Sequence, residues 1–124
     1  MLPKVDVLVV DDAPDAAQSL ALLLEQDGYA ARFALSSEEA LVAIERYKPL
    51  CVMLDIQMPG MDGLELAKYI RTKFQDDVVL IAFTGLDIAH PRVAETFDLV
   101  DHYFTKPLSP SEISKIFPRK AITV

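Results

Sequence analysis

Residues 50–63 read LCVMLDIQMPGMDG, and this segment says the most about the architecture of the chain. Its first five residues are apolar without alternation, which is typical of a central strand in a parallel sheet that is buried on both faces. Asp55 follows directly, and the turn residues of segment 58–63 predict a loop. A lone carboxylate is thus expected at the carboxyl end of a buried strand, where open α/β sheets bind ligands.

Short apolar runs rich in β-branched residues alternate with helix-period segments on both sides of this stretch. We expect strands at Val5–Val10, Ala30–Ala34, Leu50–Leu54, Val78–Phe83 and His102–Phe104. We expect helices that open near Pro14, after Ser36, at Leu64, after Pro91 and after Ser109. This order predicts an α/β fold in which a parallel sheet is covered by helices on both faces.

Local signals fix several ends of the predicted helices. Gly28 is expected to stop the first helix, and Pro49 is expected to end the second. Ser36 and Glu39 form an S-x-x-E capping box at the start of the second helix.

Length and composition exclude several classes of protein. The 124 residues predict one domain, 1–124, and a hydrophobic fraction of 52% is ample for a buried core. A net charge of −7 opposes direct binding to nucleic acid, which needs clustered basic residues. No run of about 18 apolar residues can span a membrane, so we expect a cytoplasmic protein. The single cysteine, Cys51, is interpreted as a small buried hydrophobe.

Polar side chains stand at the carboxyl ends of four predicted strands, and these ends share one edge of a parallel sheet. They are Asp11, Asp12, Asp55, Thr84 and Lys106. Three carboxylates brought together would repel one another, and a hard divalent cation would remove the conflict. Mg²⁺ favours oxygen ligands of this kind, whereas zinc sites are usually built from cysteine and histidine.

This set of residues suits phosphoryl transfer, which requires an in-line nucleophile and positive charge around the phosphoryl oxygens. The Asp55 carboxylate can act as the nucleophile and form an acyl phosphate. Lys106 and the metal would neutralise two phosphoryl oxygens, and the Thr84 hydroxyl would donate a hydrogen bond to the third.

Four segments of the chain together resemble the response-regulator receiver family. They are residues 7–12 (VLVVDD), 53–63 (MLDIQMPGMDG), 83–85 (FTG) and 103–107 (YFTKP). The resemblance implies that Asp55 accepts a phosphoryl group. It also implies that Asp12 binds Mg²⁺ directly, Asp11 through a water molecule, and Gln57 through its main-chain carbonyl.

The resemblance also carries expectations about fold, switching and partners. It implies a flavodoxin-like, doubly wound five-stranded sheet of order 2-1-3-4-5 with five helices. Tyr103 matches the aromatic switch position of the family and would act with Thr84, and the Lys106–Pro107 peptide would be cis. The phosphoryl donor would be a histidine kinase or a histidine phosphotransfer protein, and the output partner is left open.

Other interpretations remain open at this point. Taken singly, Asp12 or Asp15 can cap the first helix, Thr84 can cap its own turn, and Lys106 can be a surface lysine. A pseudo-receiver that serves only as an interaction module is one alternative. A haloacid-dehalogenase-like phosphatase is another, although that family needs a second aspartate where this chain has Gln57. The preferred interpretation is a signalling domain that catalyses its own phosphorylation and dephosphorylation and turns over no external substrate.

Overall fold

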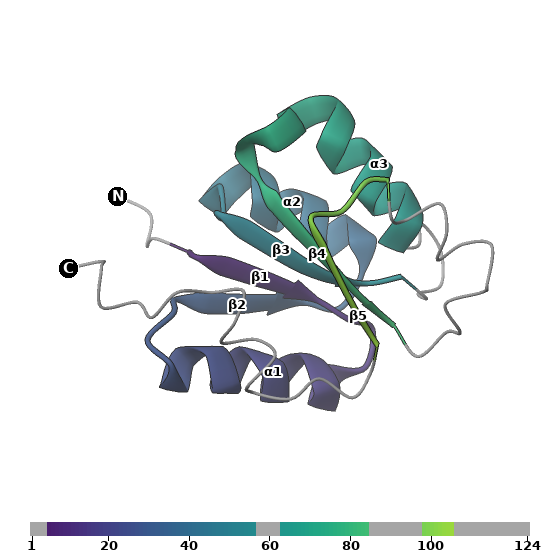
Figure 1. Cartoon of the computed structure of the whole chain (residues 1–124). Helices are drawn as coiled ribbons and strands as arrows, with labels where there is room; N and C mark the ends of the chain where they lie inside the picture. Colours follow the sequence, from purple (N-terminus) through teal and green to yellow (C-terminus); the bar gives the residue numbers. More distant parts are fainter. Residues whose placement is uncertain (1–4, 57–62, 85–97, 106–124) are drawn as a thin grey trace.

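The computed structural model of the chain describes residues 5–56, 63–84 and 98–105 (Figure 1). Its strands are β1 (Val7–Val10), β2 (Ala31–Ala34), β3 (Cys51–Asp55), β4 (Val79–Thr84) and β5 (His102–Thr105). Its helices are α1 (Pro14–Gln26), α2 (Ser37–Tyr47) and α3 (Gly63–Phe74), and a short 3-10 helix, η1, follows at Gln75–Asp77. The predicted strands are all present, within one or two residues of their expected bounds. The two helices expected after Pro91 and Ser109 lie outside the described residues.

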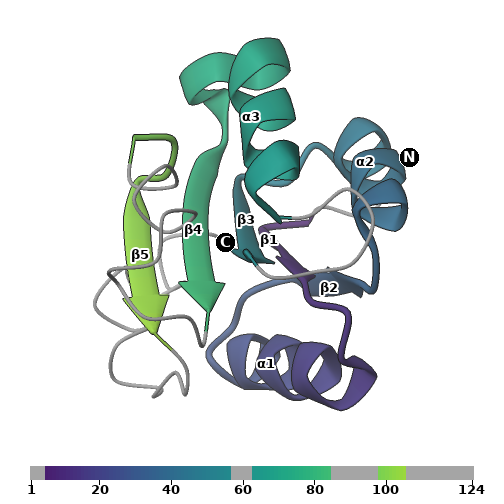
Figure 2. The ribbon, with the colours of Figure 1, turned by 90° about the vertical axis from the view of Figure 1, so that its right-hand side faces the viewer.

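The five strands form one parallel sheet in the order β2-β1-β3-β4-β5. The predicted strand order is therefore confirmed. Helix α1 covers one face of the sheet, whereas α2 and α3 cover the other (Figures 1 and 2). Each face has its own apolar core, one packed under α1 and the other under α2 and α3.

Strand β3 lies in the middle of the sheet, and all five of its residues are buried. Burial raises the pKa of the Cys51 thiol far above its ordinary value, which keeps this residue an inert part of the core. Leu50 differs from the prediction, because its side chain is 56% exposed. The ladder between β1 and β3 begins only at Cys51, so Leu50 precedes the part of the strand that the helices cover.

The capping signals act as predicted. The Ser36 hydroxyl accepts a hydrogen bond from the Glu39 N–H at 3.1 Å, and the Glu39 carboxylate accepts one from the Leu35 N–H at 3.0 Å. Gly28 follows α1 with a φ of 97°, a left-handed conformation that costs glycine little. Helix α2 ends at Tyr47, and its C-cap residue, Lys48, directly precedes Pro49. These ends fix where β2 and β3 begin.

Arg71, in the last turns of α3, joins several main-chain segments near the amino-terminal ends of β4 and β5. Its Nε donates to the Leu99 carbonyl at 2.6 Å. One terminal nitrogen donates to the carbonyls of Gln75 and Val78 at 2.7 and 2.9 Å. The other donates to the Asp101 carboxylate at 2.7 Å. The start of the edge strand β5 is therefore tied to α3 and to the start of β4.

Asp101, the residue before β5, also hydrogen-bonds to the main chain of β4. The same carboxylate oxygen accepts a hydrogen bond from the Leu80 N–H at 2.9 Å, and the Asp101 N–H donates to the Leu80 carbonyl at 2.8 Å. Partial burial acts to raise the pKa of Asp101, but the hydrogen bonds from Leu80 and Arg71 outweigh it and lower the pKa. The charged form of Asp101 is thus favoured by folding.

Asp101→Asn is expected to lower the free energy of unfolding by about 1 kcal/mol at neutral pH, since the pair is partly exposed. A lowered folded pKa gives stability that is present above the unfolded pKa of about 3.9 and lost as the pH falls through the folded value. Urea unfolding at neutral pH and at about pH 3 should therefore show the difference from the wild type shrinking in acid. Asp98→Asn, at an exposed aspartate nearby, is the control, and an equal pH dependence in both variants would contradict the assignment.

Candidate functional site

Three carboxylates meet at the carboxyl edge of the sheet. Strand β1 leads into Asp11 and Asp12, and the neighbouring strand β3 ends at Asp55. The pairing of Val10 with Leu54 sets the two strand ends side by side. One carboxylate oxygen from each of the three aspartates lies within 4.8 Å of the others. The convergence predicted for these residues is therefore present in the fold.

The three aspartates differ in exposure and in their hydrogen bonds. Asp11 is 2% exposed and Asp55 is 5% exposed, whereas Asp12 is exposed. One carboxylate oxygen of Asp11 accepts from the Ala13 N–H at 3.0 Å, and the Asp11 N–H donates to the Ala34 carbonyl at 3.1 Å. Asp11 is thus held in place by its surroundings, and Asp12 extends to the side from which solvent reaches the site.

The N-terminus of α1 shows whether a nearby aspartate caps this helix. The N-cap residue is Ala13, and no side-chain hydrogen bond caps the helix there. Neither Asp12 nor Asp15 takes the capping role that was an open alternative. The Asp12 carboxylate is therefore available to the cluster.

Gly63 holds the β3 end against the start of α3, and this role was missed in the sequence. Its N–H donates to the Ile56 carbonyl at 3.2 Å. A Cβ atom at this position would lie 2.0 Å from the main-chain oxygen of Asp55 and 2.7 Å from the Ile56 Cα. Only glycine permits this approach. In the sequence, Gly63 stands out only as one of the turn residues of segment 58–63.

The predicted switch positions lie on strands β4 and β5. Asp55 pairs with Phe83, so Thr84 follows in β4 beside the end of β3. Ala82 pairs with Tyr103 in β5, and the Tyr103 ring is half-buried against the core under α2 and α3. Burial raises the pKa of Tyr103. Thr84 and Tyr103 therefore lie on adjacent strands, as predicted.

Several predicted site residues cannot be placed. Gln57, Lys106 and the Lys106–Pro107 peptide lie outside the described residues, as does the side chain of Thr84. Strand β5 ends at Thr105, at the same edge of the sheet as the carboxylates.

The donor set at this edge fits a hard divalent cation. It offers carboxylate oxygens alone, two from buried residues and one from an exposed residue that leaves an open side. Mg²⁺ commonly uses one or two carboxylates and keeps several water molecules. The part of the chain that the structure describes holds no cysteine or histidine in this cluster, so the set does not resemble a zinc site.

Asp12→Ala is expected to weaken Mg²⁺ binding more than Asp11→Ala does. One oxygen of Asp11 is already engaged by the Ala13 N–H, whereas Asp12 is exposed. Isothermal titration of Mg²⁺ into the wild type and the two variants measures the difference. Loss of one carboxylate also relieves repulsion, so metal-free Asp12→Ala should unfold at a higher temperature than the metal-free wild type. Equal Mg²⁺ affinity in all three proteins would show that the acidic cluster is not the metal site.

Comparison with known proteins bears directly on this arrangement. The model of the response regulator receiver domain matches residues 7–117, which is most of the chain. The chain belongs to the response-regulator receiver family. It is thus a receiver domain of two-component signalling, and the resemblance seen in the sequence is confirmed.

Individual relatives agree with this assignment. An uncharacterized 14.6 kDa protein of Leptolyngbya boryana is 34% identical over 116 residues, which cover 93% of this chain and 88% of that protein. The response regulator MprA of Mycobacterium sp. strain KMS is 36% identical over 109 residues, which cover 88% of this chain and 47% of MprA. The receiver domain therefore spans about half the length of the MprA proteins that it matches.

Solved structures share the fold. A CheY-like receiver domain protein from Methanospirillum hungatei has a TM-score of 0.83 at 26% identity and covers 92% of this chain and 90% of its own. The chemotaxis protein CheY4 of Vibrio cholerae has a TM-score of 0.80 at 25% identity, with coverages of 92% and 96%. None of the helices among the described residues of this receiver domain has the length and apolar character to cross a membrane.

Proposed function

We propose that this receiver domain accepts a phosphoryl group on Asp55 from a phosphohistidine donor, with the help of Mg²⁺. The observation that carries the proposal is the cluster of Asp11, Asp12 and Asp55 at the carboxyl edge of the sheet. Asp55 ends the central buried strand, so the fold presents its carboxylate at a fixed place. Membership of the receiver family supports the same role.

The proposed step is an in-line displacement at phosphorus. An Asp55 carboxylate oxygen attacks the phosphorus, the P–N bond of phosphohistidine breaks, and the imidazole leaves with its electron pair. Lys106 would neutralise one phosphoryl oxygen, and the Thr84 hydroxyl would donate to another. Asp12, Asp55 and the Gln57 carbonyl would hold the cation, with Asp11 acting through water. When bound, Mg²⁺ would supply positive charge that offsets the charge of the phosphoryl group.

Switching is proposed to pass through Thr84 and Tyr103. A phosphoryl group on Asp55 would draw the Thr84 hydroxyl inward by a charge-assisted hydrogen bond. The space released would favour an inward position of the Tyr103 ring, and the surface around β5 would change for a partner protein. One such bond contributes about 1.5–3 kcal/mol, which corresponds to roughly a ten- to hundredfold shift between two states.

The biological setting follows from the same proposal. The chain would act as one receiver domain, in the cytoplasm, with a histidine kinase or a histidine phosphotransfer protein as donor. It would catalyse its own phosphorylation and slow dephosphorylation, and it would not turn over an external substrate. The output partner is a protein that reads the switched surface.

Acetyl phosphate tests the proposal because it supplies a phosphoryl group without a partner. With Mg²⁺, intact-mass spectrometry should show the addition of one phosphoryl group per chain, and chelation of the metal should prevent it. A wild-type chain that gains no mass under these conditions would be a pseudo-receiver. Multiple turnover of a simple phosphate ester would instead favour a phosphatase.

A further inference from the structure

Strand β2 forms one edge of the sheet, and within residues 5–56, 63–84 and 98–105 no strand pairs with its outer side. The carbonyls of Ala30 and Ala34 accept hydrogen bonds from the β1 segment, from Asp6 and Val7 in one case and from Asp11 in the other. Alternate residues of a strand in a parallel ladder direct their main-chain groups to opposite sides. Ala31 and Phe33 therefore direct their N–H and C=O groups away from β1. Such an edge is a template for the addition of another strand.

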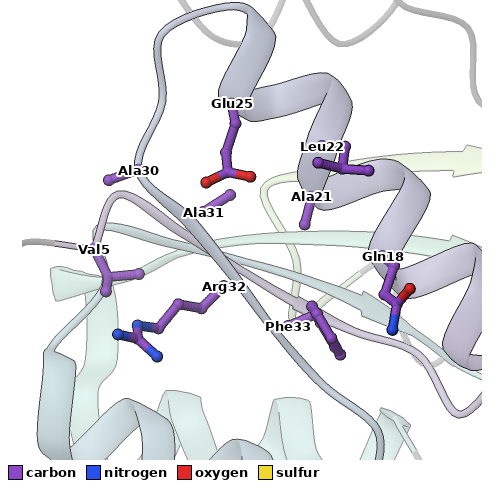
Figure 3. Close-up of a pocket in the computed structure, with 9 residues that line it drawn as sticks. All are labelled: Val5, Gln18, Ala21, Leu22, Glu25, Ala30, Ala31, Arg32 and Phe33. Carbon is purple, nitrogen blue, oxygen red and sulfur yellow. The ribbon is translucent and has the colours of Figure 1, made fainter.

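A groove runs beside this edge, between β2 and α1 (Figure 3). Its volume is about 710 Å³. Two large apolar side chains lie along it with much of their surface exposed, Leu22 of α1 at 58% and Phe33 of β2 at 40%. Ala21 and Ala31 contribute smaller apolar surface between them. The groove can thus take apolar side chains from a strand laid along β2.

The charges at this edge differ between its two faces. Arg32 is the one charged residue of β2, and its guanidinium lies 4.3 Å from the ring centroid of Tyr47 in α2. In Figure 3 Glu25 points from α1 toward β2, whereas Arg32 extends away from α1. An acidic side chain on an added strand would be repelled by Glu25 on the groove face and attracted by Arg32 on the opposite face.

Arg32 also argues against a second copy of this chain as the occupant. An antiparallel pair that uses the outward groups of Ala31 and Phe33 from both copies brings the two Arg32 side chains opposite each other. Like charges that face each other across a strand pair are destabilising. A net charge of −7 on each copy adds to this repulsion.

We propose that β2 and the groove under α1 bind an extended segment of a partner protein, which adds as a sixth strand beside β2. The segment places apolar side chains against Leu22 and Phe33, and it carries a carboxylate on the other face, opposite Arg32. Main-chain hydrogen bonds to Ala31 and Phe33 supply affinity, and the side chains supply specificity. The site lies at the sheet edge opposite β5, so it is separate from the proposed switch surface and does not depend on phosphorylation.

A synthetic peptide tests this proposal with the full chain. The probe is a blocked peptide in which valine and threonine alternate around one central glutamate, and its matched control carries lysine in place of glutamate. Titration should shift the NMR signals of Ala31, Phe33 and Leu22 and slow the hydrogen exchange of the Ala31 and Phe33 amides. The lysine peptide should bind roughly two- to fivefold more weakly, as expected for one exposed charge pair.

Reversing the charge of Arg32 tests whether this residue sets the preference for the glutamate peptide. Arg32→Glu should reverse the preference between the two peptides. Arg46→Glu is the matched control, because Arg46 also lies over the Tyr47 ring, at 5.6 Å, but belongs to α2. It should leave both affinities unchanged.

Three outcomes would overturn the proposal. They are the absence of saturable binding at millimolar peptide, equal affinity for the two peptides, and dimerisation that protects the Ala31 amide without peptide.

Discussion

Asp55→Asn is expected to abolish stable phosphorylation by acetyl phosphate, with a loss of at least about a hundredfold in the initial rate. The amide cannot act as the carboxylate nucleophile, and it removes one charge from the acidic cluster. Its shape is nearly unchanged, so the buried end of β3 should keep its packing. Intact-mass spectrometry gives the rate, and peptide mapping gives the residue that carries the phosphoryl group.

The matched control is Asp15→Asn, in the first turn of α1. It changes the net charge equally but lies outside the cluster, so it should phosphorylate as the wild type does. Weak labelling of a neighbouring residue in Asp55→Asn is compatible with Asp55 as the acceptor, because mapping separates it from the main site. Stoichiometric labelling at the wild-type rate would show that Asp55 is not the acceptor.

Gly63→Ala is expected to destabilise the fold by about 2 kcal/mol or more, which lowers the melting temperature on the order of 8 °C. In an ordinary helix the same change stabilises by up to about 1 kcal/mol, so the sign of the effect is diagnostic. The reason is the main-chain oxygen of Asp55, only 2.0 Å from the position of the new Cβ. Thermal unfolding followed by circular dichroism measures the shift.

The Gly63→Ala change should also affect the rate of phosphorylation at Asp55. If the new methyl group pushes the start of α3 and the end of β3 apart, the Asp55 main chain is displaced, and phosphorylation by acetyl phosphate should slow even below the melting transition. Thr72→Ala, at an exposed position of the same helix, is the control and should change stability by less than about 0.5 kcal/mol. An unchanged or raised melting temperature for Gly63→Ala would contradict the close approach.

The sequence predicted the sheet and the acidic cluster well, for a physical reason. Strand β3 is apolar throughout because both of its faces are covered, and the run makes it recognisable without any contact information. Once parallel strands are inferred, their carboxyl ends share one edge. Asp11, Asp12 and Asp55 are therefore brought together by topology alone.

The features that escaped prediction depend on distances between segments far apart in the chain. Gly63 matters because of its approach to Asp55, and Arg71 because of its bonds to Leu99 and Asp101. Neither residue differs locally from a common turn glycine or a surface arginine of a helix. The exposure of Leu50 was missed because periodicity does not show where a strand ladder begins.

All four strand pairs of the described sheet are parallel, so no two neighbouring strands can form as a local hairpin. Each pairing must close a long loop before it gains any hydrogen bond, which makes folding slower than in proteins rich in local contacts. Strand β5 is short and has only one neighbour among the described strands, and its start depends on Arg71 from α3. The order of assembly is therefore expected to run outward from β1 and β3, with β5 joining once α3 has docked.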